Sequence, residues 1–226
     1  MPVITMMSPK GGVGKTTTAV LLATELAELG AKVIMIDADP NFPIAKWATL
    51  PNLPSNIEVL QQVDEEGIID TIGEAQHSAG FVIVDLEGRA STRVTNALLM
   101  THLALVPMAG SVLDSDQAER AFQSIRRASR AANREIAFRA VYTRTPASTL
   151  VRSRVARSIV EGVEGAGIIA LPTPIAERTA FKALFAEGGG LATMTSGKKG
   201  SLDNARANAK AFTTDVLDAL KGGQPA

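Results

Sequence analysis

Short apolar runs alternate along the chain with longer segments in which apolar residues recur at helical spacing. The runs at 3–7, 32–36 and 81–84 are nearly all apolar, which is typical of strands buried on both faces of a parallel sheet. Further candidate strands lie at 57–60, 102–107, 136–142 and 168–171. Expected helices lie at 15–29, 65–76, 94–100, around 118–128, and at 150–163, 181–187 and 202–221. This alternation predicts an α/β fold with a mostly parallel, twisted sheet and helices on both faces.

The first apolar run leads into the sequence S-P-K-G-G-V-G-K-T-T-T at residues 8–18. A strand, a glycine-rich loop and a helix in this order are the context of a phosphate-binding loop. The glycines let backbone N–H groups point at a phosphate, and the helix beginning near Lys15 adds the positive end of its dipole. Lys15 can reach the β- and γ-phosphates, and the Thr16 hydroxyl can bind Mg²⁺. The sequence predicts a single-domain P-loop NTPase fold whose nucleotide contacts include Gly11, Gly12, Val13, Gly14, Lys15, Thr16 and Thr17.

Two features of the loop depart from the usual pattern. Pro9 stands where the first glycine is expected, and Lys10 adds a second lysine. The pattern K-G-G-x-G-K-T-T resembles that of the deviant Walker-A ATPases, the ParA/MinD superfamily. The chain looks like the short plasmid-type branch, which includes partition ATPases and the accessory ATPase of T-DNA transfer. The resemblance implies ATP and Mg²⁺ as ligands, and an ATP-dependent homodimer in which Lys10 reaches the nucleotide of the other subunit.

Carboxylates end two of the expected strands. The sequence D-A-D-P occupies 37–40, and Asp85 follows the strand at 81–84. Open α/β sheets bind ligands at the carboxyl ends of their strands, although D-x-D-P is also good turn chemistry. The resemblance makes 37–40 switch I, with Asp39 orienting the attacking water and Asp37 in the Mg²⁺ shell. It makes Asp85 the Walker-B carboxylate that, with Thr16, holds Mg²⁺.

The catalytic set implied by the resemblance is therefore Lys10, Lys15 and Asp39. Residues 86–88 take the place of switch II. Gly88 could donate its N–H to the γ-phosphate there, and Glu87 is an unusual neighbour. The resemblance also makes Pro172 a contact of the adenine. Family members often carry an Asn at the position of Thr143, and this Asn contacts the adenine. A preference for adenine is therefore implied by the family and not by local chemistry.

Composition fits one domain. The chain has 226 residues, 46% of them hydrophobic and 20% charged, which is ordinary for a well-buried core. We expect a single domain over 1–226, with a flexible basic link at 196–201 before a last helix at 202–221. The absence of cysteine excludes disulfides, thiol nucleophiles and iron–sulfur clusters. The sequence shows no basic leader and no apolar segment of membrane-spanning length, so we expect a cytoplasmic protein without a membrane partner.

Charge is unevenly distributed, although the formal net charge is zero. Eight acids and no Lys or Arg occupy 47–88, whereas ten arginines and one acid occupy 120–157. This asymmetry indicates a polyanion as a partner. Non-specific DNA binding, with nucleoid association of the ATP-bound form, would then use Arg126, Arg127, Arg130, Arg152, Arg154 and Arg157. Alternatively, these arginines form a solvated face paired with the acidic stretch at 58–87.

The function that unites these features is a ParA-like ATPase whose ATP-bound dimer binds DNA and is switched off by hydrolysis. It would serve plasmid or chromosome partitioning or DNA transfer, with a centromere-binding or cargo adaptor protein as its partner. One alternative is an ATPase that positions a protein cargo or a membrane site, although acidic residues in the last helix disfavour a membrane. The other is a small-molecule enzyme of the same fold, which would not need Lys10.

Overall fold

The computed structural model describes residues 1–89, 91–109, 112–146, 162–163, 165 and 167–222, and for residues 112–117 it describes the backbone only. A seven-stranded sheet runs through the middle of the molecule in the order β3-β2-β4-β1-β5-β6-β7. Every neighbouring pair in this sheet is parallel. The strands are β1 Val3–Met6, β2 Val33–Ala38, β3 Ile57–Gln61, β4 Phe81–Leu86, β5 Leu103–Met108, β6 Ala137–Thr145 and β7 Ile175–Ala176.

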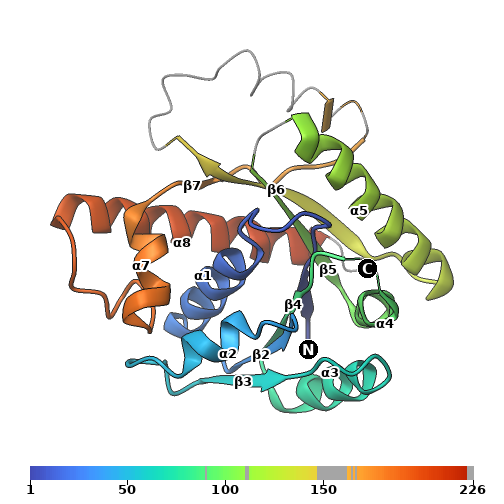
Figure 1. Cartoon of the computed structure of the whole chain (residues 1–226), viewed down its shortest axis with the longest axis horizontal. Helices are drawn as coiled ribbons and strands as arrows, with labels where there is room; N and C mark the ends of the chain where they lie inside the picture. The colour runs from blue at the N-terminus through green and yellow to red at the C-terminus, as the bar shows by residue number, and fades with distance from the viewer. Residues whose placement is uncertain (90, 110–111, 147–161, 164, 166, 223–226) are drawn as a thin grey trace.

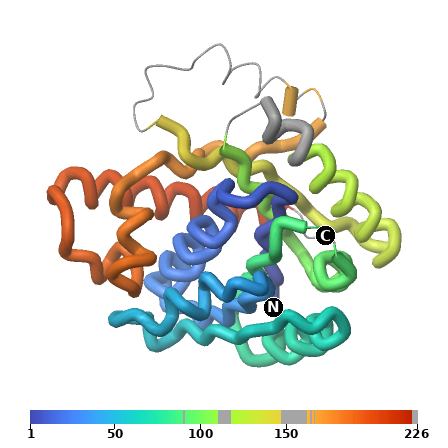
Figure 2. Tube along the Cα trace, in the orientation of Figure 1, coloured from blue at the N-terminus to red at the C-terminus, as the bar shows by residue number. Residues whose placement is uncertain are grey.

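Helices cover both faces of the sheet, so the fold has three layers (Figure 1). The helices are α1 Lys15–Glu28, α2 Pro43–Ala48, α3 Gly67–Ser78, α4 Thr92–Met100, α5 Val112–Ala131, α7 Thr179–Glu187 and α8 Lys199–Gly222. Apolar residues of α1, α2, α7 and α8 share one core, and those of α3, α4 and α5 share the other. Figure 2 shows α1, α7 and α8 on one side of the sheet and α4 and α5 on the other. The predicted α/β architecture is confirmed.

Alternation of side chains in the central strands explains the apolar runs. In β1, Ile4 and Met6 belong to the first core, whereas Val3 belongs to the second. In β4, Ile83 faces the first core, and its neighbours Val82 and Val84 face the second. Successive residues of a strand point to opposite faces. A strand covered on both faces therefore needs apolar residues at nearly every position.

The order of the strands places the loop between β1 and α1 where the strand order of the sheet reverses. β1 lies between β4 and β5, and the chain moves to one side of it for β2 and to the other for β5. Ligands of open α/β sheets bind where the order reverses in this way, beyond the carboxyl ends of the strands. The loop between β1 and α1 leaves the sheet at that point.

One predicted boundary and one predicted strand differ from the structure. The last helix begins at Lys199, not at residue 202, so the predicted link at 196–201 extends only to residue 198. Gly197, with a φ of +101°, lies in the non-helical stretch just before the helix, and the Lys198 carbonyl accepts the N–H groups of Ser201 and Leu202. The run at 168–171 forms an isolated bridge through Ala170 instead of a strand. The expected helix at 150–163 lies almost wholly outside the described residues.

Candidate functional site

A cavity of about 700 Å³ opens at the carboxyl ends of β1, β2, β4 and β6. Four segments surround it: the loop before α1, the β2–α2 loop, the β4–α4 loop and the end of β6. Its lining comprises Pro9, Gly11, Gly12, Gly14, Lys15, Thr16, Thr17, Asp39, Pro40, Asn41, Glu87, Gly88, Arg89 and Arg144. The structure thus brings the predicted phosphate loop together with both predicted switch segments. The residues predicted to bind nucleotide or Mg²⁺ that are not among the lining residues are Lys10, Val13, Asp37, Asp85 and Pro172. The contacts of Lys10 with a nucleotide and of Pro172 with adenine stay predictions.

The phosphate loop has the backbone that its glycines allow. Gly12 and Gly14 have φ values of +74° and +94°, which side chains of other residues rarely tolerate. Gly14 immediately precedes α1. The first N–H groups of a helix have no partner within the helix, so those of α1 face the cavity as donors for an anion. Lys15 is buried at this helix start, and Lys10 is half-buried in the loop.

Thr143 supports the phosphate loop from the end of β6. Its buried hydroxyl donates to the Val13 carbonyl over 2.7 Å and lies 3.0 Å from the Met108 carbonyl. A Cβ placed on Gly14 would lie 3.6 Å from the Thr143 Cβ. Thr143 is therefore a support of the loop backbone. The sequence does not predict this role, because no local pattern reveals a bond across 130 residues.

Thr16, which lines the cavity, contacts the buried Asp85. The Thr16 hydroxyl donates to Asp85 Oδ2 over 2.7 Å, and the carboxyl is 1% exposed. Within the described part of the chain, the buried Oδ1 of Asp85 has no hydrogen-bond partner. Burial raises the pKa of Asp85 to about 7, against the opposing effects of the Thr16 hydrogen bond and the Lys15 charge. An uncompensated buried carboxylate oxygen beside a threonine hydroxyl fits a hydrated Mg²⁺, which prefers such oxygen ligands.

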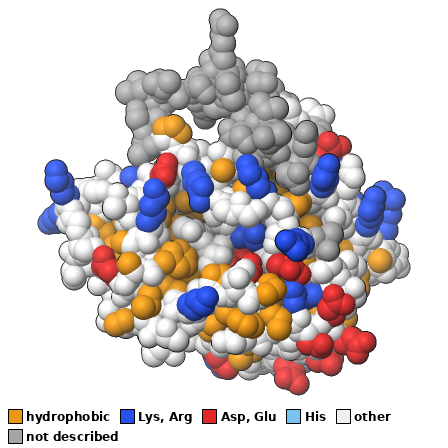
Figure 3. Space-filling model, viewed as in Figure 1, with side chains coloured by type: hydrophobic (Ala, Val, Ile, Leu, Met, Phe, Trp, Pro, Cys, Tyr) orange, Lys and Arg blue, Asp and Glu red, His pale blue; other side chains and the backbone are white. Residues whose placement is uncertain are grey.

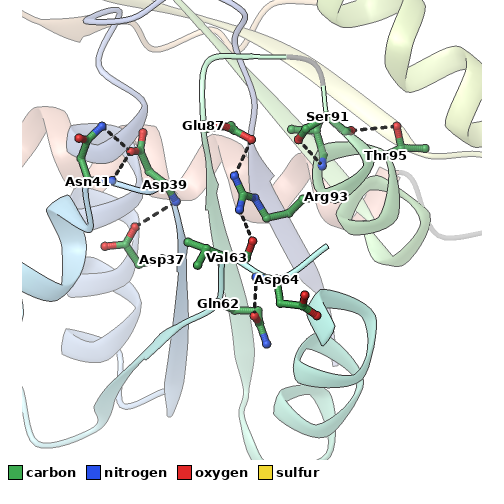
Figure 4. Close-up of polar contacts among 11 residues, drawn as sticks. Asp37, Asp39, Asn41, Gln62, Val63, Asp64, Glu87, Ser91, Arg93 and Thr95 are labelled. Carbon is green, nitrogen blue, oxygen red and sulfur yellow. Dashed lines mark hydrogen bonds and ion pairs between the residues drawn. The ribbon is translucent and has the colours of Figure 1, made fainter. Parts of the chain in front are cut away.

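Asp37 is also fully buried, but backbone groups surround it. Its Oδ2 accepts the N–H groups of Ile44 and Ala45 over 2.8 and 2.9 Å, at the start of α2. Its Oδ1 accepts the N–H of Asp39 over 3.4 Å, as Figure 4 shows. Burial raises the pKa of Asp37, and these backbone bonds oppose the shift. The carboxylate thus acts as a cap of α2, and its place in the Mg²⁺ shell stays a prediction.

Asp39 lies on the cavity wall, in the β2–α2 loop. Its Oδ1 accepts both the backbone N–H and the side-chain amide of Asn41, each over 2.9 Å (Figure 4). These two bonds fix the carboxylate while leaving lone pairs available to a water. The position suits the predicted role of orienting a nucleophilic water, and this role stays a prediction.

Two arginines in the cavity lining were not predicted. Arg144 follows Thr143, is exposed and has a φ of +52°. Arg89 follows Gly88 in the β4–α4 loop. Neither residue belongs to a recognisable motif, and only the fold brings them to the phosphate loop. Both add positive charge where an anion would bind.

The arginines of α5 form an exposed face. Arg126, Arg127 and Arg130 are exposed, while Phe122 and Ile125 of the same helix are buried against the sheet. Arg126 lies 5.8 Å from the ring centroid of Phe138. Among the described residues, the arginines of this face form no ion pair, and Glu58 and Glu87 of the acidic stretch pair with lysine and arginine from elsewhere. Arg152, Arg154 and Arg157 lie outside the described residues.

Known proteins resemble this chain in sequence and in fold. The family model for the VirC1 protein matches residues 1–219. The chain belongs to the VirC1 family. A protein named ParA from Rhizobium radiobacter is 40% identical over 97% of this chain and 98% of its own length. A virC1 protein of the same species is 29% identical over 81% of this chain and 80% of its own length.

The family match and the ParA relative support the predicted resemblance to the ParA/MinD superfamily, and a solved structure shares the fold. MinD from Pyrococcus horikoshii, solved with Mg-ADP, superposes with a TM-score of 0.73 at 16% identity, over 100% of this chain and 99% of that one. The VirC1-family chain therefore has the P-loop fold of the ParA/MinD ATPases. Among the helices that the structure describes, none has the length and apolar character needed to cross a bilayer.

Proposed function

We propose that this VirC1-family protein binds ATP and Mg²⁺ in the cavity at the end of β1 and hydrolyses the γ-phosphate. The buried Thr16–Asp85 pair, with its unpartnered Oδ1, is the observation that carries the proposal. The loop N–H groups and Lys15 would hold the phosphates, Thr16 and Asp85 the Mg²⁺, and Asp39 the attacking water. The relation to ParA and MinD proteins supports the same assignment.

We further propose that ATP controls assembly. Lys10 would complete the phosphate site of a second subunit, so that two ATP-loaded chains form a sandwich dimer and hydrolysis separates them. The arginine face of α5 would then bind DNA without sequence preference, because arginines neutralise phosphates and release counterions. Their lack of ion pairs among the described residues favours this over a solvated face paired with the acidic stretch. Such a cycle would serve partition or transfer of DNA, with an adaptor protein that stimulates hydrolysis.

Nucleotide-dependent retention on DNA tests this proposal. Binding of the purified protein to a non-specific duplex is measured with ADP, ATP and a slowly hydrolysed ATP analogue, at two salt concentrations. We expect retention only with the triphosphates, weaker at high salt, and lost in Lys10→Ala. Lys32→Ala is the matched control, because Lys32 is an exposed lysine that lies 3.9 Å from Glu58 and outside the cavity lining.

The outcomes separate the parts of the proposal. If the protein hydrolyses ATP but is not retained on DNA in any nucleotide state, the proposed ATPase activity stands and the proposed DNA switch is contradicted. Equal retention with ADP and ATP would contradict nucleotide control. Retention that survives Lys10→Ala would contradict the role of the second lysine.

A further inference from the structure

Glu87 brings a negative charge to the wall of the proposed nucleotide cavity. It lines the cavity in the β4–α4 loop, two residues after Asp85. Its neighbour Gly88 packs on the phosphate loop, since a Cβ placed there would lie 3.5 Å from the Pro9 carbonyl and 3.6 Å from the Gly11 nitrogen. A carboxylate at this place would repel phosphates that bind to the loop.

Arg93 holds this carboxylate from the other side. Its Nη2 lies 2.5 Å from Glu87 Oε1, and the two side chains are only 8% and 16% exposed. Its Nη1 donates to the Val63 carbonyl in the loop between β3 and α3. Figure 4 shows the guanidinium between Glu87 and Val63. Contacts on both sides thus fix the guanidinium, and the Glu87 carboxylate points at it.

We propose that Arg93 is a positioning residue for the triphosphate: it turns the Glu87 carboxylate toward itself and neutralises its charge beside the phosphate loop. This rests on the proposed function, and it deepens that function by naming a residue that sets the preference for ATP over ADP. Without Arg93, Glu87 would stand as an uncompensated charge near the phosphates. The γ-phosphate adds negative charge that ADP lacks, so the loss would be greater for ATP.

A purely structural ion pair makes a different prediction. Removing one partner of a buried pair destabilises a protein whatever ligand is bound. It would then weaken ATP and ADP binding by similar factors. On this alternative, the ratio of the ATP and ADP affinities stays the same in the single variant and in a variant with both partners replaced by neutral residues.

The test measures dissociation constants for ADP and for a slowly hydrolysed ATP analogue at low ionic strength, by titration of the full chain. In Arg93→Gln we expect the preference for the triphosphate to fall roughly tenfold, the scale of one unit charge acting across several ångströms of partly solvated protein. The double variant Glu87→Gln/Arg93→Gln should return to within about twofold of the starting preference, because neither charge remains. Arg134→Gln is the matched control: Arg134 also donates to a backbone carbonyl, that of Leu99 over 2.7 Å, and lies outside the cavity lining.

Every outcome decides the matter. An unchanged preference in Arg93→Gln, or no recovery in the double variant, overturns the proposal. If Arg93→Gln does not fold, Arg93→Lys keeps the charge and should keep the preference, and a preference lost in this variant also overturns it. Failure of the unaltered protein to bind either nucleotide contradicts the proposed function itself, whereas normal binding with an insensitive Arg93 contradicts only this inference.

Discussion

Asp37 and Asp85 show how neighbouring buried carboxylates acquire different roles. They lie opposite each other on the paired strands β2 and β4, and both are buried. Asp37 accepts three backbone N–H groups. Asp85 accepts one hydroxyl and keeps an unpartnered oxygen. The residue types and their places at strand ends are visible in the sequence, but the number of donors around each carboxylate depends on how the following loops fold.

Asp85 should make stability depend on pH in the absence of Mg²⁺ and nucleotide. Its pKa is 3.8 when exposed and about 7 in the fold, so the folded protein resists losing this proton. Ionisation of Asp85 therefore lowers the stability of the fold. This loss is absent below about pH 4 and grows until about pH 7, where it reaches at most about 4 kcal/mol, at roughly 1.4 kcal/mol for each pH unit. Asp85→Asn should therefore be more stable than the unaltered protein at pH 8, with a smaller difference at pH 5. Urea unfolding at the two pH values measures this.

The exposed Asp70 provides the comparison, since Asp70→Asn should not alter this pH dependence. Adding Mg²⁺ and ATP should reverse the order at pH 8, because a bound cation favours the ionised carboxylate. An Asp85→Asn protein that unfolds more easily than the unaltered one at pH 8 without ligands would show that the fold favours the ionised form.

At the scale of elements, α2 depends on the strand that precedes it. The helix has six residues, Pro43 at its start and a left-handed Phe42 just before it. Short helices are marginal by themselves, so the two N–H groups held by Asp37 and the burial of Trp47 fix it to the sheet. The β2–α2 loop that carries Asp39 is thus held at both ends. The D-A-D-P segment ends in a turn, as one interpretation of the sequence expected, and this turn carries the Asp39 of the predicted switch I.

Removal of the Asp37 carboxylate should loosen this element. Asp37→Ala leaves two helix N–H groups, one buried and one partly buried, without their acceptor. Loss of such a cap costs about 1–2 kcal/mol. We expect this decrease in the free energy of unfolding without any ligand, measured by urea denaturation. Asp70→Ala, in the first turn of α3, is the matched control and should change stability by less than about 0.5 kcal/mol. If Asp37→Ala altered Mg²⁺-dependent nucleotide binding alone, its first role would be that of a metal ligand.

How much the sequence predicts depends on the range of each contact. The β1 strand, the glycine loop and α1 are continuous in the chain, so their motif places them correctly. The Thr143 bond to Val13 and the Arg93 contacts with Glu87 and Val63 join separate elements. Their donors are ordinary residues in helices and strands, and no spacing rule distinguishes them. The start of α8 was missed for another reason, since Gly200 lies inside its first turn although glycine usually weakens a helix.

At the scale of the whole molecule, opposite charges occupy different regions of the surface. The exposed acids Asp64, Glu65 and Glu66 precede α3, and Asp70 and Glu74 continue along it. Figure 3 shows acidic side chains gathered at the lower right of one face, and Lys and Arg side chains across its upper half. Because α4 packs between α3 and α5, the acidic helix does not neutralise the arginine face. The zero net charge of the chain therefore conceals separate acidic and basic regions of the surface, and the basic one is the region that we propose binds DNA.

The salt dependence of DNA binding should reveal how many copies of the arginine face act together. Each neutralised phosphate contributes about 0.9 to the slope of the logarithm of affinity against the logarithm of salt concentration. Arg127→Ala removes one exposed arginine per chain. It should therefore lower the slope by about one for a monomer on DNA and by about two for a dimer with both faces bound. We expect a change of about two with a slowly hydrolysed ATP analogue, measured by titration at several salt concentrations.

Lys182→Ala is the comparison, because Lys182 pairs with Glu177 over 2.7 Å and should leave the slope unchanged. A change of one would contradict a dimer that presents both faces to the same duplex, and no change would exclude Arg127 from the DNA surface.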